Sequence, residues 1–337
     1  MDIKIKDVAK AANVSVATVS RVLNNSGVVT ERTRLKVQEA IESMNYHPNA
    51  TAKFLRSKKT MMIGVIVSDI NVSYYAEIVK GIENMAYSRE YKVIICDAHN
   101  QKEEELGYLE LLLNRTVDAM ILVSMTGSIS DELIGELADK GYNIGVVGKC
   151  IDHAGVPCIF TDNVKFSMNV VHHFIEQGHR SIAFLSGYPD ALDSYERLEG
   201  YMKALREHRL PFRQELIENG DFNEKGGYHA FLRLIGKGLP FTAVYSANDE
   251  MALGVYRACA EMGITIPKDL AIVGVDNNRI SRYITPRLST VDQPKYAMGA
   301  LITEKLIDQM NENQFKEQRV FKVDSELLVR ESSRFAK

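Results

Sequence analysis

The first sixty residues carry a positive charge that the rest of the chain does not share. They contain eleven Lys and Arg against five Asp and Glu, so thirty of the 41 basic residues and thirty-nine of the 44 acidic residues lie in the other 277 positions. The formal net charge of −3 therefore conceals a local charge near +6. Positive charge concentrated on an acidic body favours a polyanionic partner for this segment.

Two short apolar runs in the basic segment have the spacing of helices. The first run comprises Ile5, Val8, Ala9 and Ala12, and the second comprises Val19, Val22 and Leu23. Between the runs, Asn13 tolerates the left-handed conformation that ends a helix, and Ser15 can cap the next helix. The pattern predicts two helices joined by a tight turn.

The second of these helices leaves one face free for a partner. In a helix-turn-helix unit, residues near the N-terminus of the second helix reach base edges in the major groove. Arg21 can pair bidentately with guanine, and small apolar side chains suit the methyl group of thymine. Short polar side chains such as Ser20 can hold phosphates. The residues expected at DNA are Val16, Ala17, Thr18, Ser20, Arg21 and Asn24. A small helical hairpin with a solvated basic face is the alternative.

A third helix and a linker complete the segment. Thr30 can cap a helix that ends near Tyr46, because Pro48 disfavours helix in the residue before it. Residues 49–60 then form a stretch too short to be a stable helix alone. We expect this linker to fold only when it is bound.

Two sequence motifs resemble the LacI/GalR (lactose-repressor) family of bacterial transcription regulators, and the resemblance runs from end to end. The family pattern D-V-A-x-x-A-x-V-S-x-x-T-V-S-R-V-L-N stands at Asp7 to Asn24, with Asn13 in place of the more usual Gly. The pattern N-Y-x-P-N-x-x-A-x-x-L stands at Asn45 to Leu55. The resemblance implies a DNA-binding regulator with a near-palindromic operator.

The resemblance also gives the linker a role. In the family the linker becomes a hinge helix in the minor groove, where a leucine wedges into the central base step, and that position is Leu55 here. An apolar wedge costs a few kcal/mol of unstacking, which the contacts of bent DNA offset. The linker residues implied at DNA are Asn49, Lys53, Leu55 and Arg56. Packing of Leu55 within the hinge is the alternative.

After residue 60 the pattern changes to short apolar strands that alternate with amphipathic helices. The expected strands are Met62 to Val67, Lys92 to Cys96, Ala119 to Val123, Ile144 to Val147, Ser181 to Ser186, Ala243 to Ser246 and Leu270 to Val275. This alternation is typical of doubly wound parallel sheets, and two such sheets account for the length. The fold class expected is an all-α helix-turn-helix DNA-binding domain plus an α/β periplasmic-binding-protein-like domain of two doubly wound parallel-sheet subdomains.

Polar residues follow several of these strands, at the sheet edge where ligands of such folds bind. Hydroxyl, amide and carboxylate groups together suit a polyhydroxylated ligand, although any one of them can be a helix cap. The resemblance implies an effector pocket like that of a sugar-binding protein, with Arg197 and Asp276 gripping the ligand and Phe222 stacking on it. The effector residues expected are Ser68, Tyr74, Tyr75, Ser124, Asp162, Arg197, Phe222, Asn248 and Asp276.

The loop that often reads N-P-F-F in the family is Val72-Ser73-Tyr74-Tyr75 here. It lacks the rigid proline and adds two phenol hydroxyls at the expected pocket. Neutral sugar, sugar acid and sugar phosphate therefore stay open as ligands, as does the choice between inducer and corepressor.

Chain order suggests the domain boundaries. The headpiece is expected at 1–47, the linker at 48–60, and the effector-binding and dimerisation domain at 61–337. Within the last, the N-subdomain comprises about 61–160 and 291–319, and the C-subdomain about 161–290 and 320–337, with a final strand over 320–328. The chain has no heptad tail after that strand, so a homodimer is expected rather than a tetramer held by a coiled coil.

Other classes of protein fit less well. No signal peptide or membrane span is found, so a cytoplasmic protein is expected and a transport-type solute-binding protein is disfavoured. The four cysteines form no C-x-x-C pair, and no metal or cofactor is expected. Catalytic motifs are absent, which argues against an enzyme.

A catabolite-control regulator that is modulated by a phosphoprotein remains the alternative within the family. It calls for a basic docking surface on the N-subdomain, but the segment Lys295 to Lys305 holds only two lysines and one glutamate.

Overall fold

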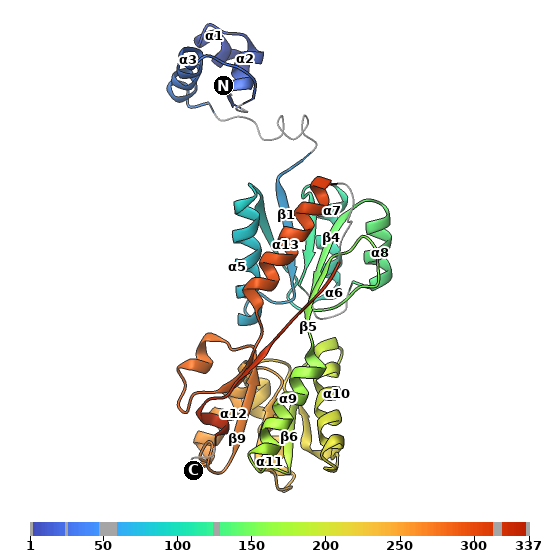
Figure 1. Cartoon of the computed structure of the whole chain (residues 1–337). Helices are drawn as coiled ribbons and strands as arrows, with labels where there is room; N and C mark the ends of the chain where they lie inside the picture. Colours follow the sequence, from blue (N-terminus) through green and yellow to red (C-terminus); the bar gives the residue numbers. More distant parts are fainter. Residues whose placement is uncertain (1–2, 24–25, 47–58, 124–128, 313–318, 335–337) are drawn as a thin grey trace. The chain divides into compact units, whose positions relative to one another are not determined.

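The computed structural model describes residues 3–23, 26–46, 59–123, 129–312 and 319–334 (Figure 1). The chain divides into two compact units, Met1–Thr60 and Met61–Lys337. Each unit has its own hydrophobic core.

The first unit contains three helices, α1 (Ile5–Ala11), α2 (Val16–Leu23) and α3 (Glu31–Ser43). Val8, Val19 and Val37, one from each helix, are fully buried against one another in its core. Asn13 adopts a left-handed φ of 51° between α1 and α2, and the Ser15 hydroxyl accepts a hydrogen bond from the Thr18 amide at 3.1 Å. The tight turn and cap expected from the sequence are therefore present.

The second unit begins with a six-stranded, fully parallel sheet in the order β11-β5-β4-β3-β1-β2. Its strands are β1 (Met62–Val67), β2 (Lys92–Asp97), β3 (Ala119–Leu122), β4 (Asn143–Val147), β5 (Cys158–Thr161) and β11 (Val320–Val323). The helices of this subdomain are α5 (Ser73–Ser88), α6 (Lys102–Tyr108), α7 (Glu110–Leu113), α8 (Asp131–Asp139) and α13 (Lys295–Glu312). Two separate apolar clusters cover the sheet, one with α5 and α13 and the other with α7 and α8. Helices on both faces are what the doubly wound pattern predicts.

Helices α5 and α13 lie against each other through two glycines. A Cβ at Gly81 would come within 2.1 Å of the Tyr296 carbonyl oxygen, and one at Gly299 within 2.0 Å of the Ile78 carbonyl oxygen. Only glycine permits backbones to approach this closely.

The second sheet has the order β12-β10-β9-β8-β6-β7 and is parallel except for the antiparallel pair β10–β12. Its strands are β6 (Ile182–Ser186), β7 (Ile217–Asn219), β8 (Ala243–Ser246), β9 (Ala271–Val275), β10 (Ser289–Asp292) and β12 (Glu326–Leu328). Its α-helices are α9 (Asn163–Glu176), α10 (Leu192–Glu207), α11 (Glu224–Gly236) and α12 (Asp249–Met262), and its short 3₁₀ helices are η1 (Gln214–Leu216), η2 (Arg279–Arg282) and η3 (Glu331–Ser333). The two-subdomain α/β fold class is thus confirmed.

The chain passes between the sheets after β5, after β10 and after β11, and these connections can be followed in Figure 1. The single final strand expected over 320–328 is wrong. Val320–Val323 extends the first sheet beside β5, whereas Glu326–Leu328 pairs with β10 in the second. Without this segment, β5 and β10 would each be an edge strand of its sheet, and each half of the segment pairs with one of them. The alternation of side chains indicates a strand but not the sheet that it joins.

Candidate functional site

The outward face of α2 carries the residues that the sequence assigns to DNA. Val16, Ala17 and Arg21 are exposed, whereas Val19 and Val22 are buried in the unit's core. Thr18 and Ser20 are half-buried, and the Thr18 hydroxyl lies 2.9 Å from that of Ser15. The expected DNA residues Asn24, Asn49, Lys53, Leu55 and Arg56 lie outside the described residues.

The second unit contains a cavity of about 490 Å³ at the carboxyl ends of strands from both sheets. Ser68 follows β1, while Asn248 and Asp276 follow β8 and β9. A cavity of this size at this place in a doubly wound fold suits a small ligand. Of the expected effector residues, those that line it are Ser68, Tyr74, Tyr75, Arg197, Phe222, Asn248 and Asp276.

The other two expected effector residues are Ser124 and Asp162. Ser124 lies outside the described residues. Asp162 is not part of the cavity wall: its carboxylate caps α9 by accepting the Lys165 amide at 2.8 Å, and it forms an ion pair of 2.5 Å with Lys322 on β11. The two oxygens of Asp162 are thus engaged by the first turn of α9 and by Lys322, so Asp162 does not line the cavity with the other expected effector residues.

The cavity wall also includes polar residues that the sequence reasoning missed. These are Asn100, Lys102, Tyr188, Asp190 and Asp193. Asn100 and Lys102 lie just beyond the carboxyl end of β2, so the strand-end rule applied to every strand would have found them. Asp193 precedes Arg197 by one helical turn, a spacing that favours an ion pair.

Arg197 is held in a buried polar cluster on α10. It is 3% exposed, and its Nη2 lies 3.1 Å from Asp193 Oδ2. Its Nε donates to Asn163 Oδ1 at 3.0 Å, and its Nη1 donates to the Ala247 carbonyl at 2.5 Å. Burial lowers the pKa of Arg197, but the acidic groups around it, Asp193 and Asp276 first among them, together raise it by more, so the guanidinium stays charged.

Asp193 and Tyr74 line the same cavity, and each has one buried polar atom that forms no hydrogen bond among the described residues. These atoms are Asp193 Oδ1, which can only accept, and the Tyr74 hydroxyl, which can donate. Burial raises the pKa of Tyr74, so its phenol keeps the proton that it can donate. Unpaired buried polar atoms cost free energy that a bound ligand recovers.

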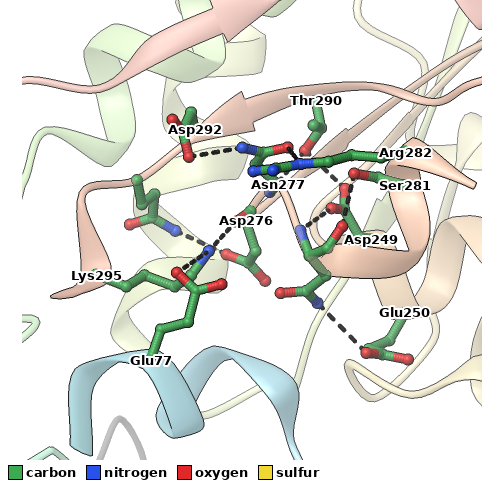
Figure 2. A network of polar contacts seen from close by, with 12 residues as sticks. Glu77, Asp249, Glu250, Asp276, Asn277, Ser281, Arg282, Thr290, Asp292 and Lys295 are labelled. Atoms are coloured by element: carbon green, nitrogen blue, oxygen red, sulfur yellow. Dashed lines mark hydrogen bonds and ion pairs between the residues drawn. The ribbon is translucent and has the colours of Figure 1, made fainter. Parts of the chain in front are cut away.

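Asp276 is a second acidic residue of the cavity wall, and Figure 2 shows the polar network around it. It is 4% exposed, and its Oδ1 accepts from Gln293 Nε2 at 2.8 Å. Its backbone carbonyl accepts from the Lys295 ammonium. Burial raises the pKa of Asp276, while Arg197, Lys295 and the hydrogen bond from Gln293 oppose that rise.

Phe222 lies in the turn before α11, and neighbouring residues hold it in place. It has a left-handed φ of 53°, and a Cβ at Gly187 would come within 1.9 Å of its ring carbons. Asn248 Nδ2 donates to the Phe222 carbonyl at 2.9 Å, while Asn248 Oδ1 accepts the Met251 amide at 2.9 Å. Both ends of the Asn248 side chain are thus engaged by the protein, which makes it a support for Phe222.

No group of three or more His, Cys, Asp or Glu within the described ranges is arranged to hold a metal ion. In the same part of the chain, no helix has the length and apolar character to cross a membrane.

Comparison with known proteins agrees with this two-part organisation. Residues 4–49 match the model of bacterial regulatory proteins of the lacI family, and residues 171–333 match a periplasmic binding protein-like domain. Catabolite control protein A of Priestia megaterium is 36% identical over 312 residues, which cover 92% of this chain and 93% of that protein. The transcriptional repressor PurR of Proteus mirabilis is 35% identical over 336 residues, which cover 97% of this chain and 96% of that protein.

A solved structure of the lac repressor dimer, bound to operator and the anti-inducer ONPF, is 25% identical and has a TM-score of 0.87 over 99% of both chains. The two sequence relatives and the solved structure therefore each match nearly the whole of this chain. The chain belongs to the lacI family of bacterial regulatory proteins and is a DNA-binding transcriptional regulator that responds to a small-molecule effector.

Proposed function

We propose that this regulator represses carbohydrate-utilisation genes and that a sugar-like effector in the 490 Å³ cavity switches its operator affinity. The observation that carries the proposal is the set of buried polar groups on the cavity wall. Asp276, Arg197 and Asp193 come from one subdomain and Tyr74 comes from the other. A ligand that touches both subdomains stabilises one degree of closure over others.

The chemistry of these groups supports a polyhydroxylated ligand. Asp193 Oδ1 accepts hydrogen bonds, whereas the Tyr74 hydroxyl can donate one. Hydroxyl groups both donate and accept, so a polyol can satisfy both kinds of atom at once. Phe222 offers an apolar ring for the C–H face of a sugar.

For DNA, the proposal places Val16, Ala17 and Arg21 in the major groove of a pseudo-palindromic operator. Their exposure on α2 supports this role, and so does the motif that they share with the family. A homodimer would present two such faces to the two half-sites. Leu55, with Lys53 and Arg56, is proposed to occupy the minor groove between them.

Regulation by a phosphoprotein is the second candidate, because catabolite control protein A is 36% identical to this chain. A docked phosphate needs accessible cations. Lys295 is only 1% exposed, and the other lysine between residues 295 and 305, Lys305, is half-buried with its ammonium 5.5 Å from the centre of the Phe321 ring. The effector-switched regulator is therefore the proposal that we favour.

A ligand screen on the full-length protein tests the proposal. Melting temperatures are measured with D-glucose, cellobiose, D-ribose, D-glucuronate and glucose 6-phosphate, because a ligand that binds the native state raises the melting temperature. The operator is first selected from random duplex DNA, and its affinity is then measured with and without each binder. We expect at least one sugar both to raise the melting temperature and to change operator affinity. A binder that leaves operator affinity unchanged, or a complete lack of binders, would contradict the proposal.

A further inference from the structure

Lys295 is a charged residue that the fold buries almost completely. It is the first residue of α13, directly after the connection from β10, and it is 1% exposed. A buried ammonium is costly unless other groups compensate its charge and satisfy its donors. Its partners therefore indicate why the chain keeps a lysine at this position.

The ammonium contacts two elements that belong to different subdomains (Figure 2). It donates to the backbone carbonyl of Asp276, just after β9 of the second sheet. It also lies 3.8 Å from Oε2 of Glu77 on α5, which packs on the first sheet. Lys295 thus joins Asp276 to the helix whose first turn supplies Tyr74 and Tyr75 to the cavity wall.

Asp276 needs such support because its backbone is strained. Its φ is 104° and that of Asn277 is 49°, values that residues with a side chain seldom adopt. Strain of this kind persists only where surrounding contacts impose it, and it is common at ligand clamps. Here the conformation directs the carboxylate into the cavity.

Four contacts that hold Asp276 and Asn277 come from one short segment, residues 290–295. The Asp276 amide donates to the Val291 carbonyl at 2.9 Å, and the Asn277 amide donates to the Thr290 hydroxyl at 3.1 Å. Gln293 holds the Asp276 carboxylate, and Lys295 holds its carbonyl. The Lys295 contact is the one of these four that reaches on to α5.

A second contact joins the same turn of α5 to the other subdomain. The Ser73 hydroxyl donates to Glu250 Oε1 at 2.9 Å, and Asn278 Nδ2 lies 3.3 Å from the same oxygen. Ser73 and Glu77 are one helical turn apart, so they lie on one side of α5. This side of the helix is therefore connected to the turn of residues 276–278 twice, through Glu250 and through Lys295.

We infer that Lys295 is a positioning residue: it holds Asp276 in the strained conformation that faces the cavity, and through Glu77 it ties that conformation to the N-subdomain. Subdomain closure and the orientation of the ligand-gripping carboxylate then change together. The inference rests on the proposed function for the role of Asp276, but its test needs no ligand.

Hydrogen–deuterium exchange of the full-length, ligand-free protein provides the test. The amides of Asp276, Asn277 and Asn278 are all hydrogen-bonded, so their exchange reports on the strained turn. Lys295→Met removes the charge and the donors while keeping an unbranched side chain that is shorter by one heavy atom. We expect exchange of this turn to rise roughly tenfold while the rest of the second sheet stays protected. Lys305→Met, on the same helix, is the matched control and should leave the turn unchanged.

Glu77→Gln keeps the inference testable if Lys295→Met folds poorly. The Glu77 side chain is 53% exposed, so the substitution is mild, and the residue does not belong to the strained turn. We expect it to raise exchange at residues 276–278 by about two- to threefold, and to add nothing once Lys295 is replaced. Unchanged exchange in both variants, or a rise spread over the whole subdomain, would overturn the inference. Neither result would touch the proposed effector response, which the ligand screen tests separately.

Discussion

At the scale of single residues, the cavity is shaped as much by its supports as by the groups that meet a ligand. Phe222 depends on a neighbour without a side chain, since its ring occupies the space where Gly187 would carry a Cβ. Gly187 is not among the residues with positive φ, so alanine is acceptable there for the backbone, and the three atoms nearest to its Cβ position are ring carbons of Phe222.

Replacing Gly187 with alanine should therefore displace Phe222 and weaken effector binding by about tenfold or more, a loss typical of a misplaced contact group. The measurement is calorimetric titration with the effector identified by the screen, together with the melting temperature of the free protein. The control compares the single variant Phe222→Ala with a double variant that carries both Gly187→Ala and Phe222→Ala. Because both act through one ring, the double variant should bind no worse than Phe222→Ala alone, and additive losses would contradict the idea.

Asp276 should make effector binding depend on pH. Burial raises its pKa, and ligand hydroxyls donate to the ionised carboxylate, so a proton competes with the ligand as the pH falls. Affinity should be greatest above this raised pKa and decline through it. Asp276→Asn should bind weakly at every pH and lose this dependence, while operator binding without ligand persists. A wild-type affinity that is flat from neutral to acidic pH would remove Asp276 from the ligand contacts.

At the scale of elements, the pairing of α5 with α13 is the most constrained contact of the N-subdomain. A methyl group at Gly81 would meet the Tyr296 carbonyl at 2.1 Å, and backbone cannot move aside cheaply. Gly81→Ala should lower the free energy of unfolding by about 2–3 kcal/mol, as overpacking does. Gly107→Ala in α6 is the control, since nothing lies within 4 Å of its Cβ position and alanine favours the helix by up to about 1 kcal/mol. Equal denaturation midpoints for the two variants would contradict the packing argument.

Helices and strands also show which features of the fold and site the sequence could predict. Local signals sufficed for the turn at Asn13 and for the alternation of strands and helices, because a turn residue or a periodic apolar face acts within a few residues. They failed for residues 320–328, where the sheet that each half joins depends on distant edges. They also failed to separate Asp162, which caps α9 and contacts Lys322, from the residues that line the cavity, since a carboxylate after a strand can serve a cap, a crossover or a ligand. Burial of Lys295 was invisible because its partners lie 19 and 218 positions away in the sequence.

At the scale of the whole molecule, charge is divided between a basic first unit and an acidic second one. A local charge near +6 on the first sixty residues attracts DNA, while the excess of acid on the remainder repels it. Phosphate contacts release counterions, so operator affinity should fall steeply with salt, by about 10³-fold or more between 50 and 200 mM if six or more phosphates are neutralised.

Two variants, each of which removes one positive charge, show which part of the chain makes operator affinity depend on salt. Arg21→Gln removes an exposed cation of α2 and should cost about 1–3 kcal/mol of operator binding, with relaxed preference for the base that it reads. Lys305→Gln removes the same charge from the second unit and should change neither the affinity nor the slope of its logarithm against that of salt concentration. Fluorescence anisotropy with operator and random duplexes across a salt series measures both quantities. A shallow slope in the wild type, or equal effects of the two variants, would mean that the basic segment is not the part of the chain that holds the operator.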